Sequence, residues 1–554
     1  MTKPTLLATV EEWLFRHRLG FLVLFLVLTA VLFGFATQTK VDARFEKQLP
    51  QQHEYIETFR KYQDEFGGAN RVIVALVVKE GDVFTADYFN KLEALTDEVY
   101  AMHGVRQESV TSLFTPNVRF TEVVEDGFSG GNVVPADFET TPEGLARVRE
   151  NALKSNYMGR LVTDSFNGAM VMANLFEIDP DTKEPLDTFA VASELEALRG
   201  KYEDDKTGVH IIGFSKVMGD VRSGALNVIT FFCITIVITS LLVWLYSQSF
   251  LFSVLPMSCS LAAVVWQLGT LHLMGYGIDP MSILVPFLVF AIGVSHGVQM
   301  VRVFRNQLFE GVDPIEAARS AFRELLVPGG VALLTDTIGF ITILLIPVPT
   351  IRELAIAASV GVAAIIVTNL ILLPLMLSYL KPRAGYRERV ARRKEKTVVF
   401  WHRVALVTRP RLAKGLVIVG TILFVLGFDQ AARVEVGDLH QGVPELRPES
   451  RYNRDTAVIT ENFNLGVDVL VAFTETVKDG SVDYEVMELL DRFEWHLKNV
   501  EGVKSVLGLA GMARKINSGY SEGSLKWQVL PFNKAMLAQS VGRVETSTGL
   551  TNFD

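Results

Sequence analysis

Seven stretches of the sequence are apolar over nearly the whole length that a helix needs to cross a bilayer, which is about 20 residues. They comprise residues 19–36, 225–246, 250–274, 281–301, 329–347, 352–380 and 412–429. In lipid every backbone polar group must be paired internally, so each stretch predicts a membrane-spanning helix. The first stretch is interpreted as an uncleaved anchor and not as a secretory signal peptide, because 412–429 has the same layout deep inside the chain.

The distribution of charge predicts the orientation of these helices. Residues 381–411 carry eleven Lys and Arg side chains against two acidic ones, so this loop is predicted to be cytoplasmic. Counting the crossings backwards places residues 38–224, with 20 basic and 32 acidic side chains, on the outside. The whole chain has a net charge of -9 and lacks the basic footprint that phosphate binding requires, so nucleic acid is not an expected partner.

These features divide the chain into six regions. They are a first span at 1–37, an external α/β domain at 38–224, spans two to six at 225–380, a basic cytoplasmic loop at 381–411, a seventh span at 412–429 and the start of a second external domain at 430–554. Between the fourth and fifth spans, apolar residues recur at helical spacing over 313–326. This pattern predicts a separate helix along the cytoplasmic surface.

The first external segment has the alternating pattern of a mixed α/β domain. Strands are predicted at 71–79, 105–113, 170–178 and 209–214, with helices at 85–102 and 186–203. Two β-α-β units in this order indicate a split, ferredoxin-like arrangement. The segment contains no GxSxG, HExxH or phosphate-loop motif, so we expect neither an enzyme nor a bound cofactor or metal.

Part of the sequence occurs twice. The segment YIETFRKYQDEFGGANRVIVAL at 55–76 aligns without gaps with YNRDTAVITENFNLGVDVLVAF at 452–473, so that Phe66 meets Phe463. If each unit is one span, an external domain and five spans, twelve spans in all are expected. The sequence reaches Asp554 inside the second external domain. We interpret it as a fragment, and the alternative is a shortened protein that completes itself by oligomerising.

Three segments carry a resemblance to a known family. They are FAIGVSHGVQMVRVFR (290–305), GGVALLTDTIGFITILLIPVPTIRELAIAASVGV (329–362) and LILLPLML (370–377). Together with the order of spans and external domains, they resemble the MMPL branch of the RND transporter superfamily, which is related to sterol-sensing-domain proteins. The resemblance implies a polytopic α-helical membrane protein with α+β, ferredoxin-like periplasmic porter domains and an RND-type repeat of 1 + 5 spans, the second one incomplete.

The same resemblance implies a function and a set of partners. The protein would be a multi-pass exporter of the inner membrane, driven by protons, with its large domains in the periplasm. Its substrate would be lipid-like or otherwise hydrophobic. Its protein partners would be a periplasmic adaptor or lipoprotein and further copies of the same chain.

The fourth span departs from this family in one place. MMPL transporters typically carry an Asp-Tyr pair followed by Gly, whereas this chain has Ser295-His296-Gly297. The acidic group is missing, which puts in doubt that the family's carboxylate relay works unchanged here.

Two ionisable side chains inside predicted spans are the candidates for proton binding. His296 lies in the fourth span and Asp336 in the fifth, although such a group costs about 2.5 to 3.5 kcal/mol on insertion scales. Counted from the cytoplasmic end of each span, both sit roughly 8 to 11 Å into the membrane, so they could face each other. The supporting polar side chains close to them are Ser295, Gln299, Thr335 and Thr337.

We hypothesise that His296 and Asp336 form a proton-loading pair, because histidine titrates near physiological pH and a neighbouring carboxylate favours its charged form. In the alternative interpretation, Asp336 caps or bridges helices without titrating, and His296 stays neutral and donates one hydrogen bond. Gly293 and Gly297 form a GxxxG pair, which fits either a defined close contact between helices or generic packing.

Two other functions fit the same spans. A sterol-sensing-like, lipid-binding regulator would need no titratable pair in the membrane. An accessory protein of protein translocation would use its external domains to bind unfolded chains. The pair of His296 and Asp336 favours the proton-driven exporter, because ionisable side chains inside the membrane mark ion pathways by default.

Overall fold

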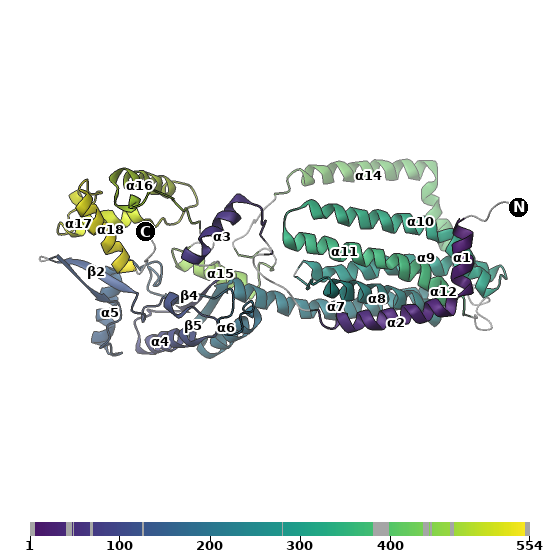
Figure 1. Ribbon diagram of the computed structural model, residues 1–554, viewed down its shortest axis with the longest axis horizontal. Helices are drawn as coiled ribbons and strands as arrows, with labels where there is room; N and C mark the ends of the chain where they lie inside the picture. Colours follow the sequence, from purple (N-terminus) through teal and green to yellow (C-terminus); the bar gives the residue numbers. More distant parts are fainter. Residues whose placement is uncertain are drawn as a thin grey trace. The chain divides into compact units, whose positions relative to one another are not determined.

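The computed structural model of the chain describes residues 6–39, 47, 49–66, 70–124, 127–279, 281–380, 398–435, 442–443, 446–465 and 470–548. The chain forms two compact units, and each unit combines distant parts of the sequence (Figure 1). Unit 1 comprises Met1–Glu57 and Ser223–Glu435, and unit 2 comprises Thr58–Arg222 and Val436–Asp554. Unit 1 therefore holds the seven apolar stretches, and unit 2 holds most of the two external segments.

Seven helices of the described residues are long and apolar enough to span a membrane. They are α2 (Arg18–Ala36), α7 (Phe214–Ser247), α8 (Phe250–Leu273), α9 (Val285–Phe309), α10 (Pro314–Thr342), α11 (Pro349–Val367) and α14 (Pro410–Ala431). After α11 the chain continues through a π-helical turn, η5 (Thr368–Leu372), into the short α12 (Leu373–Leu377). The prediction of a multi-pass helical membrane protein is confirmed.

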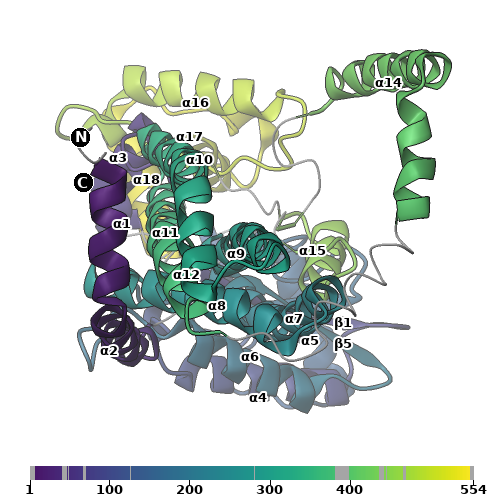
Figure 2. The ribbon, with the colours of Figure 1, turned by 90° about the vertical axis from the view of Figure 1, so that its right-hand side faces the viewer.

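The centre of unit 1 is made by α8, α9 and α11, which Figure 2 shows end-on and side by side. In α8, and in the helical stretch Pro349–Leu377 that begins with α11, 61% of the most apolar 18 residues are buried inside the protein. The most apolar 18 residues of α7 and of α14 are not buried at all. Helix α2 packs against α8, where Trp266 Nε1 donates to Thr29 Oγ1 at 2.9 Å. The exposed apolar surface of α7 and α14 is of the kind that lipid tails solvate.

The helix predicted at 313–326 is present, but it is not separate from the fifth span. This segment is the first half of α10, which continues through Pro328 without a break. Asp313 caps the helix by accepting a hydrogen bond from the Ile315 amide at 3.1 Å. A second helix starting at Pro328 would have Val327 at its N-cap, a side chain that accepts no hydrogen bond. Inside an apolar stretch the freed backbone groups would stay unpaired, so one continuous helix is favoured.

Unit 2 contains a three-stranded sheet in the order β4-β1-β5. The central strand β1 (Arg71–Val78) pairs antiparallel with β4 (Gly168–Asn174) on one side and with β5 (Thr207–Gly213) on the other. The helix α4 (Ala86–Ala101) packs against β4, and α6 (Thr188–Tyr202) packs against β5. These three strands and two helices agree within a few residues with five of the six predicted elements and place them around one core.

A buried tyrosine ties the central strand to its neighbour. The hydroxyl of Tyr88, on α4, donates to the Leu76 carbonyl of β1 and accepts from the Ala169 amide of β4, both at 2.7 Å. The side chain is 2% exposed, and this burial raises the pKa of the phenol far above its ordinary value. The tyrosine therefore stays neutral and serves as a hydrogen-bonded part of the core.

The strand predicted at 105–113 is wrong, because this segment forms only isolated bridges to β4 and its extension. The bridges lie on either side of the short turn η2 (Gln107–Ser109). Within that turn, Ser109 Oγ accepts the hydrogen bond of the Asn174 amide at 2.9 Å. A side-chain oxygen thus occupies the place of a backbone carbonyl, and the regular ladder is interrupted.

The described residues contain further helices and one hairpin. They include α1 (Leu6–Arg16), α3 (Glu54–Phe66), β2 (Arg119–Val124), β3 (Gly127–Asn132), α5 (Pro142–Lys154), α15 (Arg451–Asn462), α16 (Tyr484–Lys498), α17 (Leu509–Gly519), α18 (Lys534–Thr548) and the short turns η3 (Ser282–Leu284), η4 (Ile343–Leu345), η6 (Leu406–Thr408), η7 (Gly480–Val482) and η8 (Leu525–Trp527). Helix α15 follows the seventh span as α3 follows the first, and it packs against β5.

Two sequence-based expectations fall partly outside the described residues. The repeat predicts a strand near 468–473, but 466–469 are not described, and 470–475 form no strand. Of the basic loop, 381–397 are not described, and Val398–Thr408 forms a short apolar helix.

Candidate functional site

His296 and Asp336, the predicted proton-loading pair, do not meet in this structure. His296 is half-buried on α9, and its Nδ1 lies 3.1 Å from the carbonyl oxygen of Ile292 in the same helix. Its ring lies beside α10, where a Cβ placed on Gly329 would be 3.7 Å from His296 Cδ2. Asp336 is exposed two helical turns further along α10, about 10 Å away along the axis.

The register differs from the expectation because both helices extend beyond their apolar stretches. His296 stands 13 residues before the end of α9 at Phe309, whereas Asp336 stands 22 residues after the start of α10 at Pro314. Two residues of a helical hairpin lie at equal depth only when these two counts are similar. The expectation that the pair faces each other is therefore not met, while a role of either residue in proton binding stays a prediction.

The four supporting polar side chains are Ser295, Gln299, Thr335 and Thr337. The two on α9 are exposed. Both threonine hydroxyls on α10 donate to carbonyl oxygens one turn earlier in the same helix, each at 2.8 Å. The threonines thus satisfy their hydroxyls within their own helix and do not orient Asp336.

Gly293 and Gly297 mark the closest contacts of α9. A Cβ on Gly293 would lie 2.8 Å from Ser260 Oγ of α8. A Cβ on Gly297 would lie 2.6 Å from Pro256 Cβ of α8 and 2.9 Å from Asn369 Oδ1 of η5. Side-chain carbons do not approach other atoms this closely, so the backbone of α9 is in direct contact with α8 and η5 at these two positions.

Two side-chain amides are fully buried in the same bundle, Gln267 on α8 and Asn369 on η5. Gln267 Nε2 donates to the Ala357 carbonyl, and Asn369 Nδ2 donates to Thr368 Oγ1, both at 3.2 Å. Gln267 Oε1 and Asn369 Oδ1 accept no hydrogen bond from any residue that the structure describes. A buried acceptor without a donor costs about 1 to 3 kcal/mol, so such groups in a native protein call for an explanation.

The sequence-based prediction missed both amides because it started from ionisable side chains in the spans and considered polar side chains only next to them. An amide within an apolar stretch is visible in the sequence, and it was the available signal. The π-helical turn that aims Asn369 at α9 has no such signal, since π-helical turns arise from tertiary packing and often occur at functional sites.

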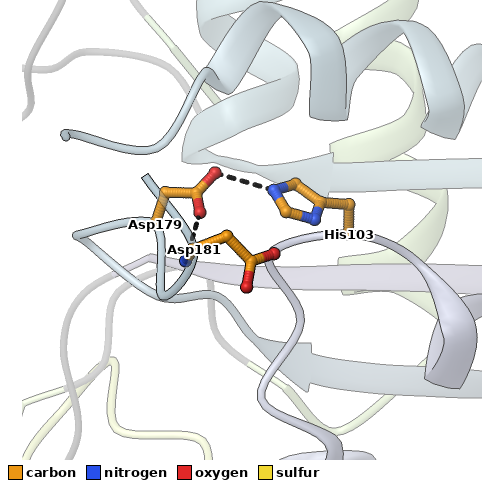
Figure 3. Close-up of side chains that lie close together, drawn as sticks. All are labelled: His103, Asp179 and Asp181. Carbon is orange, nitrogen blue, oxygen red and sulfur yellow. Dashed lines mark hydrogen bonds and ion pairs between the residues drawn. The ribbon is translucent and has the colours of Figure 1, made fainter. Parts of the chain in front are cut away.

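A second polar group lies in unit 2, where His103, Asp179 and Asp181 point toward one another (Figure 3). His103 Nε2 lies 2.7 Å from Asp179 Oδ2, and Asp179 Oδ1 accepts hydrogen bonds from the Asp181 and Thr182 amides at 2.8 and 3.1 Å. The hydrogen bonds from His103 and from these amides lower the pKa of Asp179 to about 2. In turn, the hydrogen bond to Asp179 raises the pKa of His103.

This group has a donor set that divalent transition metals accept, one imidazole nitrogen and two carboxylates with ligand atoms within 4.8 Å of one another. Both oxygens of Asp179 are already engaged, however, so the observed arrangement is an ion pair that fastens the turn at 179–182 to His103. The two partners stand 76 residues apart and belong to no metal-binding motif, which is why the sequence did not reveal them.

A buried charge network in unit 2 surrounds Asp455 of α15, which is 1% exposed. The carboxylate accepts hydrogen bonds from Arg199 Nη2 at 2.7 Å, from His210 Nδ1 at 2.9 Å and from the Ile211 amide at 3.2 Å. Burial alone would raise the pKa of Asp455, but the hydrogen bonds from His210 and Arg199 outweigh it and hold the pKa below its ordinary value. The network fastens α15 to α6 and β5.

Two comparisons relate this chain to known proteins. Residues 47–413, most of the first external segment and the spans that follow it, match the family described as the MMPL family. A curated protein of Methanocaldococcus jannaschii, whose name gives a membrane location and no activity, is 23% identical to this chain over 382 residues. The similarity covers 66% of this chain and 91% of that protein.

Proposed function

Because the chain belongs to the MMPL family, we propose that it is a secondary transporter of the RND type, which exports lipid-like or other hydrophobic molecules at the expense of the proton gradient. The family match carries this proposal, since it covers the external domain and the spans together. Seven apolar helices support a protein that resides in the membrane. We place it in an inner membrane, with its large domains in the periplasm.

Unit 2 is proposed to contain the porter domains. The antiparallel order β4-β1-β5, with α4 after β1 and α6 before β5, supports a split βαβ arrangement of the ferredoxin type. The placement of α3 and α15 after the first and the seventh span supports a second porter-like domain that begins near 430. A periplasmic adaptor or lipoprotein and further copies of the chain are the partners proposed with it.

Proton coupling is proposed to use His296 and Asp336 as two separate positions. His296 lies between α9 and α10, so a change in its charge would alter the contact between these helices. Asp336 is exposed beside Leu334 and Ile338, which are exposed as well. A charged carboxylate on such an apolar face is costly in a bilayer, so proton binding and the position of α10 are linked.

The test is substrate efflux from proteoliposomes that contain the full chain, with and without an imposed pH gradient. We expect efflux of a fluorescent lipid to stop when the gradient is collapsed, and Asp336→Asn to slow the gradient-driven rate by about tenfold. Thr335→Val is the matched control, because its hydroxyl is satisfied within α10. Gradient-independent efflux would contradict proton coupling, and an unchanged rate in Asp336→Asn would remove this residue from the proposal.

A lipid-binding regulator related to sterol-sensing-domain proteins is the second candidate. The separation of His296 from Asp336 and the missing acid in the fourth span favour it, because a regulator needs no proton-loading pair. Binding of a fluorescent lipid to the purified chain, without efflux and without proton uptake in proteoliposomes, is the result that would support this function over transport.

A further inference from the structure

The N-terminal helix α1 is anchored by charge to the first half of α10. Glu11 of α1 is 3% exposed, and its Oε1 lies 3.1 Å from Arg319 Nε and 3.2 Å from Arg323 Nη1. Arg323 Nη2 also donates to Glu316 Oε1 at 2.6 Å. The two acidic and two basic side chains compensate one another, so an ion-pair network holds α1 against α10.

A second anchor lies on the other side of a bend in the chain. The helix α1 lies across the axis of α2, and His17 between them departs from helical geometry, with φ -104° and ψ 21° (Figure 1, Figure 2). Directly after the bend, Arg18 Nη1 donates to Ser378 Oγ at 3.1 Å, and its guanidinium lies 4.2 Å from the centroid of the Tyr379 ring. Both partners follow the end of α12. The segment Leu6–Arg18, which we call the N-terminal strap, therefore joins the first half of α10 to the end of α12.

The half of α10 that the N-terminal strap holds is separated from the other half by a sequence that favours bending. Residues 328–330 are Pro-Gly-Gly in the middle of the helix. The proline cannot donate to the carbonyl of Glu324, and glycine is a weak helix former. Bends in helices occur at such residues. The ion pairs with Glu11 all precede Pro328, whereas Asp336 follows it.

The contacts of the N-terminal strap are of a kind that can open. Burying an ion pair removes water from both charges, and this cost largely offsets their attraction, so the pair contributes little net free energy. Arg319 and Arg323 are already 28% and 45% exposed, so water reaches them as soon as Glu11 leaves. Leu14 and Phe15, which are buried with Glu11, can pass into lipid, because lipid tails are as apolar as the protein interior.

We propose that the N-terminal strap restrains a hinge in α10. While Glu11 is bound to α10, the two halves of this helix stay aligned, and release of the strap lets the first half pivot at Pro328–Gly330. The ring of His296 lies beside the hinge, since its Cδ2 would be 3.7 Å from a Cβ on Gly329, so a pivot changes the surroundings of His296. The strap and the hinge stand on these contacts alone, whereas their part in transport rests on the proposed function.

Distances between two spin labels, measured by double electron–electron resonance on the full chain in nanodiscs, test the strap. The labels are attached to Glu324→Cys, exposed on the first half of α10, and to Phe250→Cys, exposed at the start of α8, in a background without the two native cysteines. We expect one narrow distance distribution. Glu11→Lys sets like charges against the arginines of α10 and should broaden it. Glu12→Lys, the same charge change on the exposed side of α1, is the matched control. Identical distributions in these two variants would overturn the restraint.

Two further variants separate the strap from a loss of folding and locate the hinge. Adding Arg323→Glu to Glu11→Lys restores two acidic and two basic side chains and should restore the narrow distribution; if it stays broad, the ion pairs are not the restraint. Adding Gly330→Ala to Glu11→Lys should narrow it as well, because alanine strengthens the helix and its methyl would have no atom within 4 Å. Gly339→Ala, equally free of contacts in the second half of α10, should leave it broad. Equal effects of the two alanines would overturn the hinge.

Locking the strap tests its part in transport. A reducible bis-maleimide joins Glu11→Cys to Arg319→Cys in proteoliposomes, and gradient-driven efflux of a fluorescent lipid is measured before and after reduction of the linker. We expect the linker to slow efflux by about tenfold and its reduction to restore the rate. N-ethylmaleimide, which caps both thiols without joining them, should not slow efflux. An unchanged rate in fully linked protein overturns the role of the strap in transport. If the wild type exports no lipid under a gradient, the proposed function fails, and the spin-label distances alone decide the strap.

Discussion

At the scale of single residues, Asp455 keeps its charge in a buried position because Arg199 and His210 donate hydrogen bonds to it. Neutralising one member of such a network leaves buried charge uncompensated, which typically costs about 3 to 5 kcal/mol. We therefore predict that Asp455→Asn lowers the free energy of unfolding by roughly 3 kcal/mol. Urea unfolding of the purified chain, followed by tryptophan fluorescence, measures this difference.

The matched control for this change is Asp429→Asn, which removes an exposed carboxylate paired with Arg433 and should cost less than about 1 kcal/mol. Equal losses at both positions would contradict the importance of burial. The pKa of Asp455 is depressed in the folded chain, so its contribution is present above the unfolded pKa of about 3.9 and is lost as the pH falls through the folded value.

The ion pair of His103 and Asp179 gives a pH dependence of the opposite sign. The pKa of His103 is raised in the folded chain, so its contribution to stability is complete below the unfolded pKa of about 6.5 and is lost as the pH rises through the folded value. We predict that the melting temperature falls between about pH 6 and pH 8 by a component that His103→Gln removes. His496→Gln, at an exposed histidine, should keep this component; its loss there would refute the assignment.

At the scale of elements, the packing of α9 depends on its glycines. An alanine methyl at Gly297 would lie 2.6 Å from Pro256 Cβ, so α8 and α9 would have to move apart. We predict that Gly297→Ala lowers stability in detergent by about 1 to 3 kcal/mol. The control is Gly339→Ala on α10, where no atom lies within 4 Å of the new methyl, and helix propensity alone should stabilise by up to about 1 kcal/mol. A destabilised Gly339→Ala would mean that the loss at Gly297 cannot be assigned to its contact with Pro256.

The elements also show which features a single sequence can predict. The spans were predicted because a bilayer demands long apolar helices, and β1 was predicted because its residues are apolar on both faces. The prediction of a strand at 105–113 was wrong because the Ser109 side chain interrupts the ladder. It does so by accepting a hydrogen bond from the amide of Asn174, which is 65 positions away in the sequence. The predicted depth of Asp336 was wrong because the apolar stretch does not reveal that it is continuous with a helix that begins at Pro314. The surroundings of Asn369 come from three helices, which no local pattern specifies.

At the scale of the whole molecule, the orientation of the chain in the membrane is a prediction from the basic loop and the number of crossings. If the seven candidate spans of the described residues all cross the membrane, the segments after the first and the seventh span are expected on the same side. The match to the MMPL family over residues 47–413 covers most of the first segment between spans together with the five spans that follow it. Under the proposed function, this orientation determines from which side a proton would reach His296.

Labelling of single cysteines with a membrane-impermeant maleimide tests this orientation. Cys233 and Cys259 are first replaced by serine and alanine, which leaves a background without thiols. We predict that Glu80→Cys, in the exposed turn after β1, reacts in intact spheroplasts, because unit 2 is expected outside. Glu310→Cys, in the exposed turn between α9 and α10, should react only after lysis. The reverse pattern would invert the assigned orientation, and labelling of both in intact cells would mean that the crossings between them were miscounted.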